Sequence, residues 1–141
     1  MMDNLDFGIT ADANHALAVL RGMEISDTLA ADQHFAPGIF LSVDPESDTK
    51  VRLTSAPGRL CDLDCTTKRP GRWLSLNVEL GACDLSRCSV LTLMCKSRAP
   101  HTLTFRACLR SGHEGGFVDA FFQKRVIAYD EESVHADVMK P

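Results

Sequence analysis

The chain has 141 residues and a formal net charge of -4 at pH 7, with 45% hydrophobic and 24% charged residues. This length fits one domain, and this composition is that of ordinary soluble globular proteins, which argues against intrinsic disorder. The acidic balance, together with the shortness of the longest basic run at residues 67–72, argues against nucleic-acid binding.

The distribution of apolar residues argues against two further classes of protein. No apolar run approaches the roughly 20 residues that a membrane-spanning helix needs. Residues 1–6 have neither the basic start nor the apolar stretch of a secretory signal. We therefore expect a cytoplasmic protein that does not associate with membranes. In a reducing cytosol its six cysteines should be mostly free thiols that pack as small hydrophobes (Cys61, Cys65, Cys83, Cys88, Cys95 and Cys108).

The N-terminal part of the chain contains one ambiguous segment, residues 11–23. Its apolar residues recur at helical spacing, from Ala13 through Leu20 to Met23, but Ala16, Ala18 and Leu20 also alternate as in a strand. Both structures stay open at this point. Residues 26–37 are polar, and Pro37-Gly38 at their end is a strong break signal.

From residue 39 onward, short segments with strand patterns follow at intervals of roughly ten residues, separated by turns rich in Pro, Gly, Asn and Asp. They are 39–43, 50–54, 59–65, 73–80, 90–96, 103–110, 117–122, 125–129 and 134–139. Such spacing is typical of sandwiches and jelly rolls. We predict an all-β fold, a two-sheet antiparallel β-sandwich (jelly roll), to which residues 11–23 add one short helix if they are helical. We expect a single domain over residues 1–141.

The clearest alternation lies between Trp73 and Arg110, where large apolar residues occupy every second position. We predict that this apolar face forms the core. Its members are Leu74, Leu76, Val78, Leu80, Leu91, Leu93, Leu103, Phe105 and Leu109.

The opposite face of the same strands carries the candidate binding residues. Trp73, Asn77 and Glu79 come from one strand, and Arg106 and Arg110 from another. On one sheet surface, the indole could stack on a sugar ring while the arginine forks bind hydroxyls or a carboxylate. The alternative is an ordinary solvent-exposed face in which Glu79 pairs with an arginine across strands.

A glycine-rich turn at residues 112–116 contains the remaining candidate, His113. Its imidazole could titrate or bind a ligand, and the alternative is a flexible turn with solvated side chains. The cysteine pairs 61/65 and 83/88 lack the spacing of a zinc knuckle. The chain contains no phosphate-binding loop, hydrolase elbow or zinc-protease motif. We therefore assign no catalytic residue, no metal ligand and no cofactor.

The order of motifs in the second half resembles that of a known family. These motifs are Trp73-Leu74-Ser75-Leu76, Asp84-Leu85-Ser86, Val90-Leu91-Thr92-Leu93, Ala99-Pro100, the strand from Phe105 to Arg110, and Phe117-Val118-Asp119-Ala120-Phe121-Phe122. Over residues 73–122 the chain resembles the galactose-binding-like jelly roll of carbohydrate-binding modules. The resemblance implies a two-sheet sandwich that binds a sugar or another polar ligand on a concave face or at loop ends, often with a calcium ion.

These observations lead to a main functional hypothesis and two alternatives. The main hypothesis is a non-catalytic binding module for a carbohydrate-like or other small polar ligand, such as a metabolite, on a concave sheet face. The first alternative is a protein-interaction or self-assembly domain, with a protein partner or a homo-oligomer formed through residues such as Phe117 and Phe121. The second is a metal-assisted enzyme on a jelly-roll scaffold.

Overall fold

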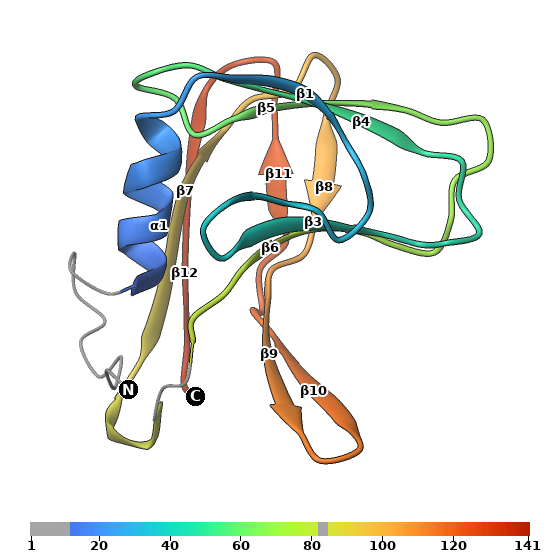
Figure 1. Cartoon of the computed structure of the whole chain (residues 1–141). Helices are drawn as coiled ribbons and strands as arrows, with labels where there is room; N and C mark the ends of the chain where they lie inside the picture. Colours follow the sequence, from blue (N-terminus) through green and yellow to red (C-terminus); the bar gives the residue numbers. More distant parts are fainter. Residues whose placement is uncertain (1–11, 82–84) are drawn as a thin grey trace. The chain divides into compact units, whose positions relative to one another are not determined.

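The structure, a computed structural model, describes residues 12–81 and 85–141. Most of its regular structure is strand, arranged in small antiparallel sheets with one short α-helix. Its described residues divide into two compact units, residues 12–81 (unit 1) and residues 85–141 (unit 2), coloured blue to green and yellow to red in Figure 1. The all-β prediction is confirmed at this level, and the single domain stays a prediction.

The ambiguous N-terminal segment contains a helix, α1 (Asp12–Arg21). Ala16 and Leu20, one turn apart, are buried, which is the helical alternative of the sequence pattern. The helix ends where the N–H of Gly22 donates to the carbonyl of Val19 at 3.0 Å. The buried Ser55 hydroxyl lies 3.3 Å from the Leu20 carbonyl, so it joins the end of α1 to strand β4.

Unit 1 contains two three-stranded antiparallel sheets. The first has the order β1 (Ile25–Leu29), β4 (Lys50–Ser55), β5 (Asp62–Thr66), and the second has the order β2 (His34–Ala36), β3 (Ile39–Val43), β6 (Leu74–Val78). Strands β1 and β2 lie in the polar segment before Pro37-Gly38, where the sequence pattern indicates no strand. Alternation of apolar residues does not identify them, because β1 buries only Leu29 and β2 is three residues long.

The core of unit 1 lies between its sheets and under the helix. One cluster joins α1 to β2 and β3 through Leu20, Ala36 and Ile39. A second cluster joins the two sheets and consists of Leu29, Leu41, Val51 and Leu53. Leu20, Ile39 and Leu53 are completely buried, so α1 and the middle strands β3 and β4 all contribute apolar surface to this core.

Strand β6 corrects the prediction that the leucine face of 73–110 is the core. Its pairing with β3 places Leu76 beside the buried Leu41, on the inward face as predicted. However, β6 is an outer strand of its sheet, and Leu74 and Leu76 remain 43% and 39% exposed. A side chain on the correct face is buried only where another layer covers it.

Unit 2 contains a short 3-10 helix, η1 (Leu85–Arg87), and three two-stranded antiparallel sheets. The pairs are β7 (Leu91–Ser97) with β12 (Ser133–Met139), β8 (Leu103–Phe105) with β11 (Val126–Ala128), and β9 (Cys108–His113) with β10 (Gly116–Phe121). The predicted strand 103–110 is therefore interrupted at residues 106–107.

The interruption is matched by a bulge on the returning chain. Residues 122–125 lie between β10 and β11, opposite only residues 106–107. The buried carboxylate of Asp137 accepts a hydrogen bond from the Lys124 N–H at 2.9 Å, which fastens the bulge to β12. This N–H and that of Val138 hold the pKa of Asp137 below its ordinary value.

Burial in unit 2 is sparse. Among residues 85–141, the buried apolar side chains are Phe122, Val126 and Ala128. Leu103 and Phe105, predicted to be core, are 56% and 42% exposed, which again corrects the prediction. No helix in the described ranges is long and apolar enough to cross a membrane.

Candidate functional site

Two loops meet at one end of unit 1, because the strand pairing brings their ends together. Loop 44–49 joins β3 to β4, and loop 67–73 joins β5 to β6. Val43 pairs with Leu74 at one side of this end, and Lys50 pairs with Thr66 at the other. The first loop carries three acidic residues and the second three basic ones, so opposite charges face each other.

Asp44 fastens the two loops together. Its carboxylate accepts hydrogen bonds from the N–H of Arg72 at 2.7 Å and of Glu46 at 3.0 Å, and its own N–H donates to the Trp73 carbonyl at 3.2 Å. Asp44 is buried, with 4% exposure. The N–H groups of Arg72 and Glu46 favour the charged form and hold the pKa of Asp44 below its ordinary value.

Asp48 holds the two loops together a second time, at the side where β4 begins and β5 ends. One carboxylate oxygen accepts bonds from the N–H of Arg69 at 2.7 Å, the N–H of Lys68 at 3.1 Å and the Thr67 hydroxyl at 3.1 Å. The N–H of Arg69 is the largest cause of a pKa of Asp48 below its ordinary value. Both aspartates are therefore occupied by the protein's own donors, as structural anchors are.

Gly71 permits the close approach of the two loops. A Cβ atom at this position would lie 2.5 Å from the Cβ of Asp44 and 2.7 Å from its Oδ2. Both distances are shorter than side chains tolerate, so only glycine fits without displacing Asp44.

The surface formed by the two loops has two hollows, and Arg72 lines both of them. An open hollow of about 540 Å³ is lined by Asp44, Glu46, Arg69, Pro70, Gly71 and Arg72. A smaller one of about 280 Å³ is lined by Asp44, Pro45, Glu46, Arg72 and Trp73. We call the two together the loop cleft.

The loop cleft presents two arginines and an aromatic ring. Arg69 donates its Nε to the Glu46 carbonyl at 3.2 Å, which orients the guanidinium. The guanidinium of Arg72 has no hydrogen bond or ion pair within residues 12–81 and 85–141, and the Trp73 side chain is 49% exposed. Unpaired guanidinium forks bind carboxylates and phosphates, and exposed indoles stack on sugar rings.

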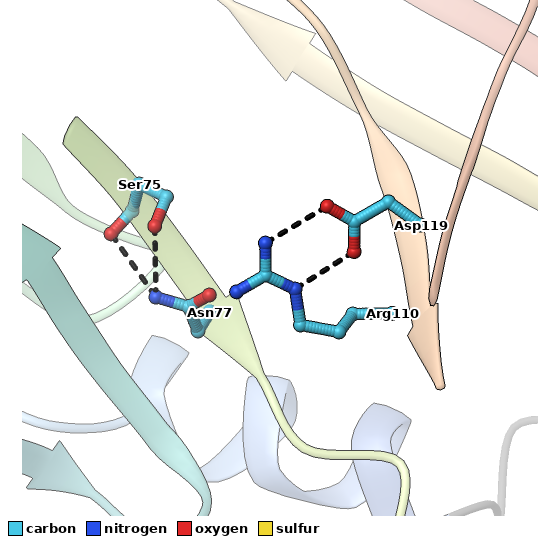
Figure 2. Close-up of polar contacts among 4 residues, drawn as sticks. All are labelled: Ser75, Asn77, Arg110 and Asp119. Atoms are coloured by element: carbon cyan, nitrogen blue, oxygen red, sulfur yellow. Dashed lines mark hydrogen bonds and ion pairs between the residues drawn. The ribbon is translucent and has the colours of Figure 1, made fainter. Parts of the chain in front are cut away.

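Three of the predicted site residues lie in unit 1. Trp73 borders the loop cleft. The Asn77 side chain points back to its own strand and donates to Ser75 Oγ at 3.1 Å (Figure 2). Glu79 lies 3.3 Å from His34, so its partner is a histidine and not the arginine expected across strands. Of the three, Trp73 is the one that borders the cleft.

The other three lie in unit 2, on or beside the β9–β10 hairpin. Arg110 donates to both carboxylate oxygens of Asp119, at 2.7 and 2.8 Å, so its fork is occupied (Figure 2). Its guanidinium also lies 3.7 Å from the centre of the Phe117 ring, and that of Arg106 lies 3.9 Å from the Phe121 ring. His113 contacts the carbonyl of Glu114 next to it. The predicted set is thus divided between the two units, and a shared binding face stays a prediction.

The five cysteines in the described ranges are free thiols, as expected, and Cys83 lies outside those ranges. Cys65 and Cys108 are exposed, which corrects the expectation that they pack as buried hydrophobes. Cys65 lies in β5, an outer strand of its sheet, and Cys108 is the first residue of β9 in a two-stranded sheet. Within residues 12–81 and 85–141, no three His, Cys, Asp or Glu side chains gather as a metal-binding group.

Sequence reasoning missed four of the residues that line the cleft: Asp44, Glu46, Arg69 and Arg72. A signal was present, because an acidic turn and a basic turn of similar length each follow a strand of the predicted sandwich. From the sequence, the basic run at residues 67–72 is considered only as a possible nucleic-acid-binding segment. Its proximity to the acidic turn depends on the strand order, which alternation does not encode.

Comparison with protein-family models, curated proteins and solved structures finds no match. The resemblance to galactose-binding-like modules therefore stays a prediction, and the function has to be argued from the geometry of the chain itself.

Proposed function

We propose that the protein is a non-catalytic binding module that takes a small acidic polar ligand, a carboxylated carbohydrate, in the loop cleft of unit 1. The two-sheet jelly roll predicted from the sequence is the scaffold that we propose for it. The observation that carries the proposal is the exposed guanidinium of Arg72, which has no hydrogen-bond or ion-pair partner among the described residues. Arg72 lines both hollows and is followed in the chain by the exposed Trp73.

The ligand class follows from the donors. Arg72 offers a planar fork that matches a carboxylate, and Arg69 adds a second positive charge already oriented by the Glu46 carbonyl. Trp73 offers a flat apolar surface for the ring of a sugar. Glu46, on the rim, can accept hydrogen bonds from hydroxyl groups. A neutral sugar would leave the arginines unused, and a purely apolar ligand would leave them desolvated.

The rigidity of the cleft also supports binding. Asp44 and Asp48 fix the backbone on both sides of Arg69 and Arg72 before any ligand arrives. Binding therefore costs less conformational entropy than it would at a free loop. The sequence favours a concave sheet face for the ligand. We propose the loop ends instead, which are the other location that the family resemblance implies.

Isothermal titration calorimetry with trigalacturonate and with neutral galactotriose tests the proposal. We expect binding of the acidic trimer that weakens with added salt, and at least about tenfold weaker binding of the neutral one. Arg72→Ala should weaken the binding of trigalacturonate about 10- to 100-fold, because a hydrogen-bonded ion pair is lost. Arg72→Lys should recover part of the affinity, since the charge returns without the fork.

Arg59→Ala is the matched control. Arg59 is an exposed arginine of unit 1 that pairs with Asp62. It lies in the connection between β4 and β5, at the opposite end of these strands from the loop cleft. Its removal changes the net charge by the same amount as Arg72→Ala and should leave the affinity for trigalacturonate unchanged. An equal loss of affinity in Arg72→Ala and Arg59→Ala would mean that the net charge, and not the loop cleft, attracts the ligand. No binding of either trimer would contradict the proposal.

A further inference from the structure

Strand β10 has apolar side chains on both of its faces. Phe117 and Phe121 lie on one face, 56% and 45% exposed, and Val118 lies on the other, 60% exposed. A strand that is apolar on both faces is typical of the interior of a sheet. Here β10 is paired on one side with β9 and, within residues 12–81 and 85–141, with nothing on the other.

The free edge of β10 also lacks the features that keep edges apart. Natural edge strands carry lysine, proline or an unpaired charge that discourages pairing. The six residues Gly116–Phe121 contain one charged residue, Asp119, and Arg110 neutralises it. A two-stranded hairpin by itself is at best marginally stable in water. The hairpin therefore has both a need for a further strand and an edge that accepts one.

The ladder geometry shows which groups this edge offers. His113 and Gly116 flank the two-residue turn and form the first pair of the hairpin. Because hydrogen-bonded and non-hydrogen-bonded pairs alternate in an antiparallel ladder, the N–H groups of Phe117, Asp119 and Phe121 point outward.

We propose that the protein forms a twofold-symmetric dimer in which β10 pairs antiparallel with β10 of a second copy. Antiparallel pairing of a strand with itself is the arrangement that a twofold axis permits. The result is a four-stranded sheet with the order β9-β10-β10-β9, in which β10 becomes an interior strand. This inference does not rest on ligand binding in the loop cleft.

The apolar surface exposed by unit 2 is comparable to that of a standard dimer interface. Seven large apolar side chains of β8 to β11 and the residue that follows are exposed: Leu103, Phe105, Phe117, Val118, Phe121, Ile127 and Tyr129. At about 100 Å² each they offer on the order of 700 Å², close to the roughly 800 Å² per partner of a standard interface.

The aromatic face of the hairpin is also organised in advance. Arg106 and Arg110 stack on Phe121 and Phe117, and Asp119 fixes Arg110 from the side. Arginine and aromatic residues are enriched at protein interfaces, and side chains already held in place lose little entropy on association. These contacts extend as one face across the proposed four-stranded sheet.

Sedimentation equilibrium over low to high micromolar concentrations tests the proposal. The wild type should have twice the chain mass of 15.5 kDa. Val118→Lys puts like charges close to the twofold axis, since Val118 lies in the middle of β10, and should weaken the dimer at least about tenfold. Ser111→Lys is the matched control, because Ser111 pairs with Val118 on the same face but at the far strand, β9. It should remain dimeric.

The other outcomes contradict edge pairing. A monomeric wild type overturns the proposal, as do two variants that both stay dimeric. Loss of the dimer in both variants would indicate packing through the face of the hairpin and not through its edge. Hydrogen exchange provides a readout that needs no variant. The N–H groups of Phe117, Asp119 and Phe121 should be protected at high concentration and exchange rapidly on dilution, and unprotected groups at all concentrations would overturn the proposal.

Discussion

The two units of the chain use similar strands to very different effect. Unit 1 buries Leu20, Ile39 and Leu53 completely between two sheets and a helix. Unit 2 has strands of similar length and alternation, yet most of its large apolar side chains are exposed. In unit 1, two three-stranded sheets and a helix cover one another. In unit 2, each sheet has only two strands and leaves most of its apolar side chains uncovered. A strand pattern identifies the face that should be buried, and a second layer is what buries it.

This difference also separates the two proposals. The loop cleft belongs to unit 1, whose buried core holds the strands that carry the two loops, so its arginines can be positioned before a ligand binds. The β9–β10 hairpin stands on the part that lacks cover, so its exposed edge is suited to association. Four predictions follow from the contrast between a covered and an uncovered unit.

The largest effect is expected from truncating the same residue type in each unit. Leu53→Ala removes a fully buried side chain and should lower the free energy of unfolding by about 2–5 kcal/mol. Leu103→Ala removes a side chain that is 56% exposed and should cost less than about 1 kcal/mol. Urea unfolding followed by circular dichroism measures both. Equal losses would contradict the contrast in burial.

The next effect concerns the two glycines that differ most in their surroundings. Gly71→Ala drives a Cβ atom into Asp44 and should destabilise unit 1 by about 1–3 kcal/mol. Gly112→Ala, in β9, meets nothing within 4 Å and should change stability little. Fluorescence of Trp73, the only tryptophan and next to the cleft, reports the unfolding of unit 1. If Gly71→Ala is tolerated as well as Gly112→Ala, the close approach of the loops is wrong.

A smaller effect is expected from acid. Asp44 and Asp48 have pKa values below their ordinary range in the folded state. A lowered folded-state pKa stabilises the fold above the unfolded pKa of about 3.9, and this stabilisation is lost as the pH falls toward the folded pKa. Asp44→Asn should therefore lower stability at neutral pH and reduce the change between about pH 7 and pH 3. Trp73 fluorescence during urea unfolding measures it, and an unaltered pH dependence would speak against the anchoring role.

The smallest effect is the order in which thiols react. Burial raises the pKa of the Cys61, Cys65, Cys95 and Cys108 thiols, so all four should react slowly at neutral pH. Cys65 and Cys108 are exposed and should be alkylated by iodoacetamide before the half-buried Cys61 and Cys95. Mass spectrometry of the labelled peptides gives the order. Faster labelling of Cys61 than of Cys65 would contradict the greater exposure of Cys65 in β5.

Much of the strand content could be predicted from alternation alone. Residues 39–43 form β3 with the predicted bounds, and β4, β10 and β12 differ from their predictions by a residue or two. Local pattern suffices there, because these strands have one or two consistent apolar faces. It did not suffice for β1, whose only buried residue is Leu29, or for the interruption at residues 106–107, which a bulge on another segment imposes.

The candidate site was harder to predict, because it depends on which loops become neighbours. Trp73 was identified by its chemistry, but Arg72 was not, since its partner loop lies 28 residues earlier, at Asp44. The charge of each turn is visible in the sequence. Their meeting follows from the pairing of β3 with β6 and of β4 with β5, which only the folded chain provides.

The central claim is that the self-supporting unit holds the ligand site, and a nuclear magnetic resonance titration with trigalacturonate tests it most directly. We predict shifts of the Trp73 indole N–H and of the backbone N–H groups of Arg69 and Arg72, with no change in residues 108–121. Shifts confined to the hairpin of Arg110 and Phe117, or no shifts at saturating ligand, would contradict it.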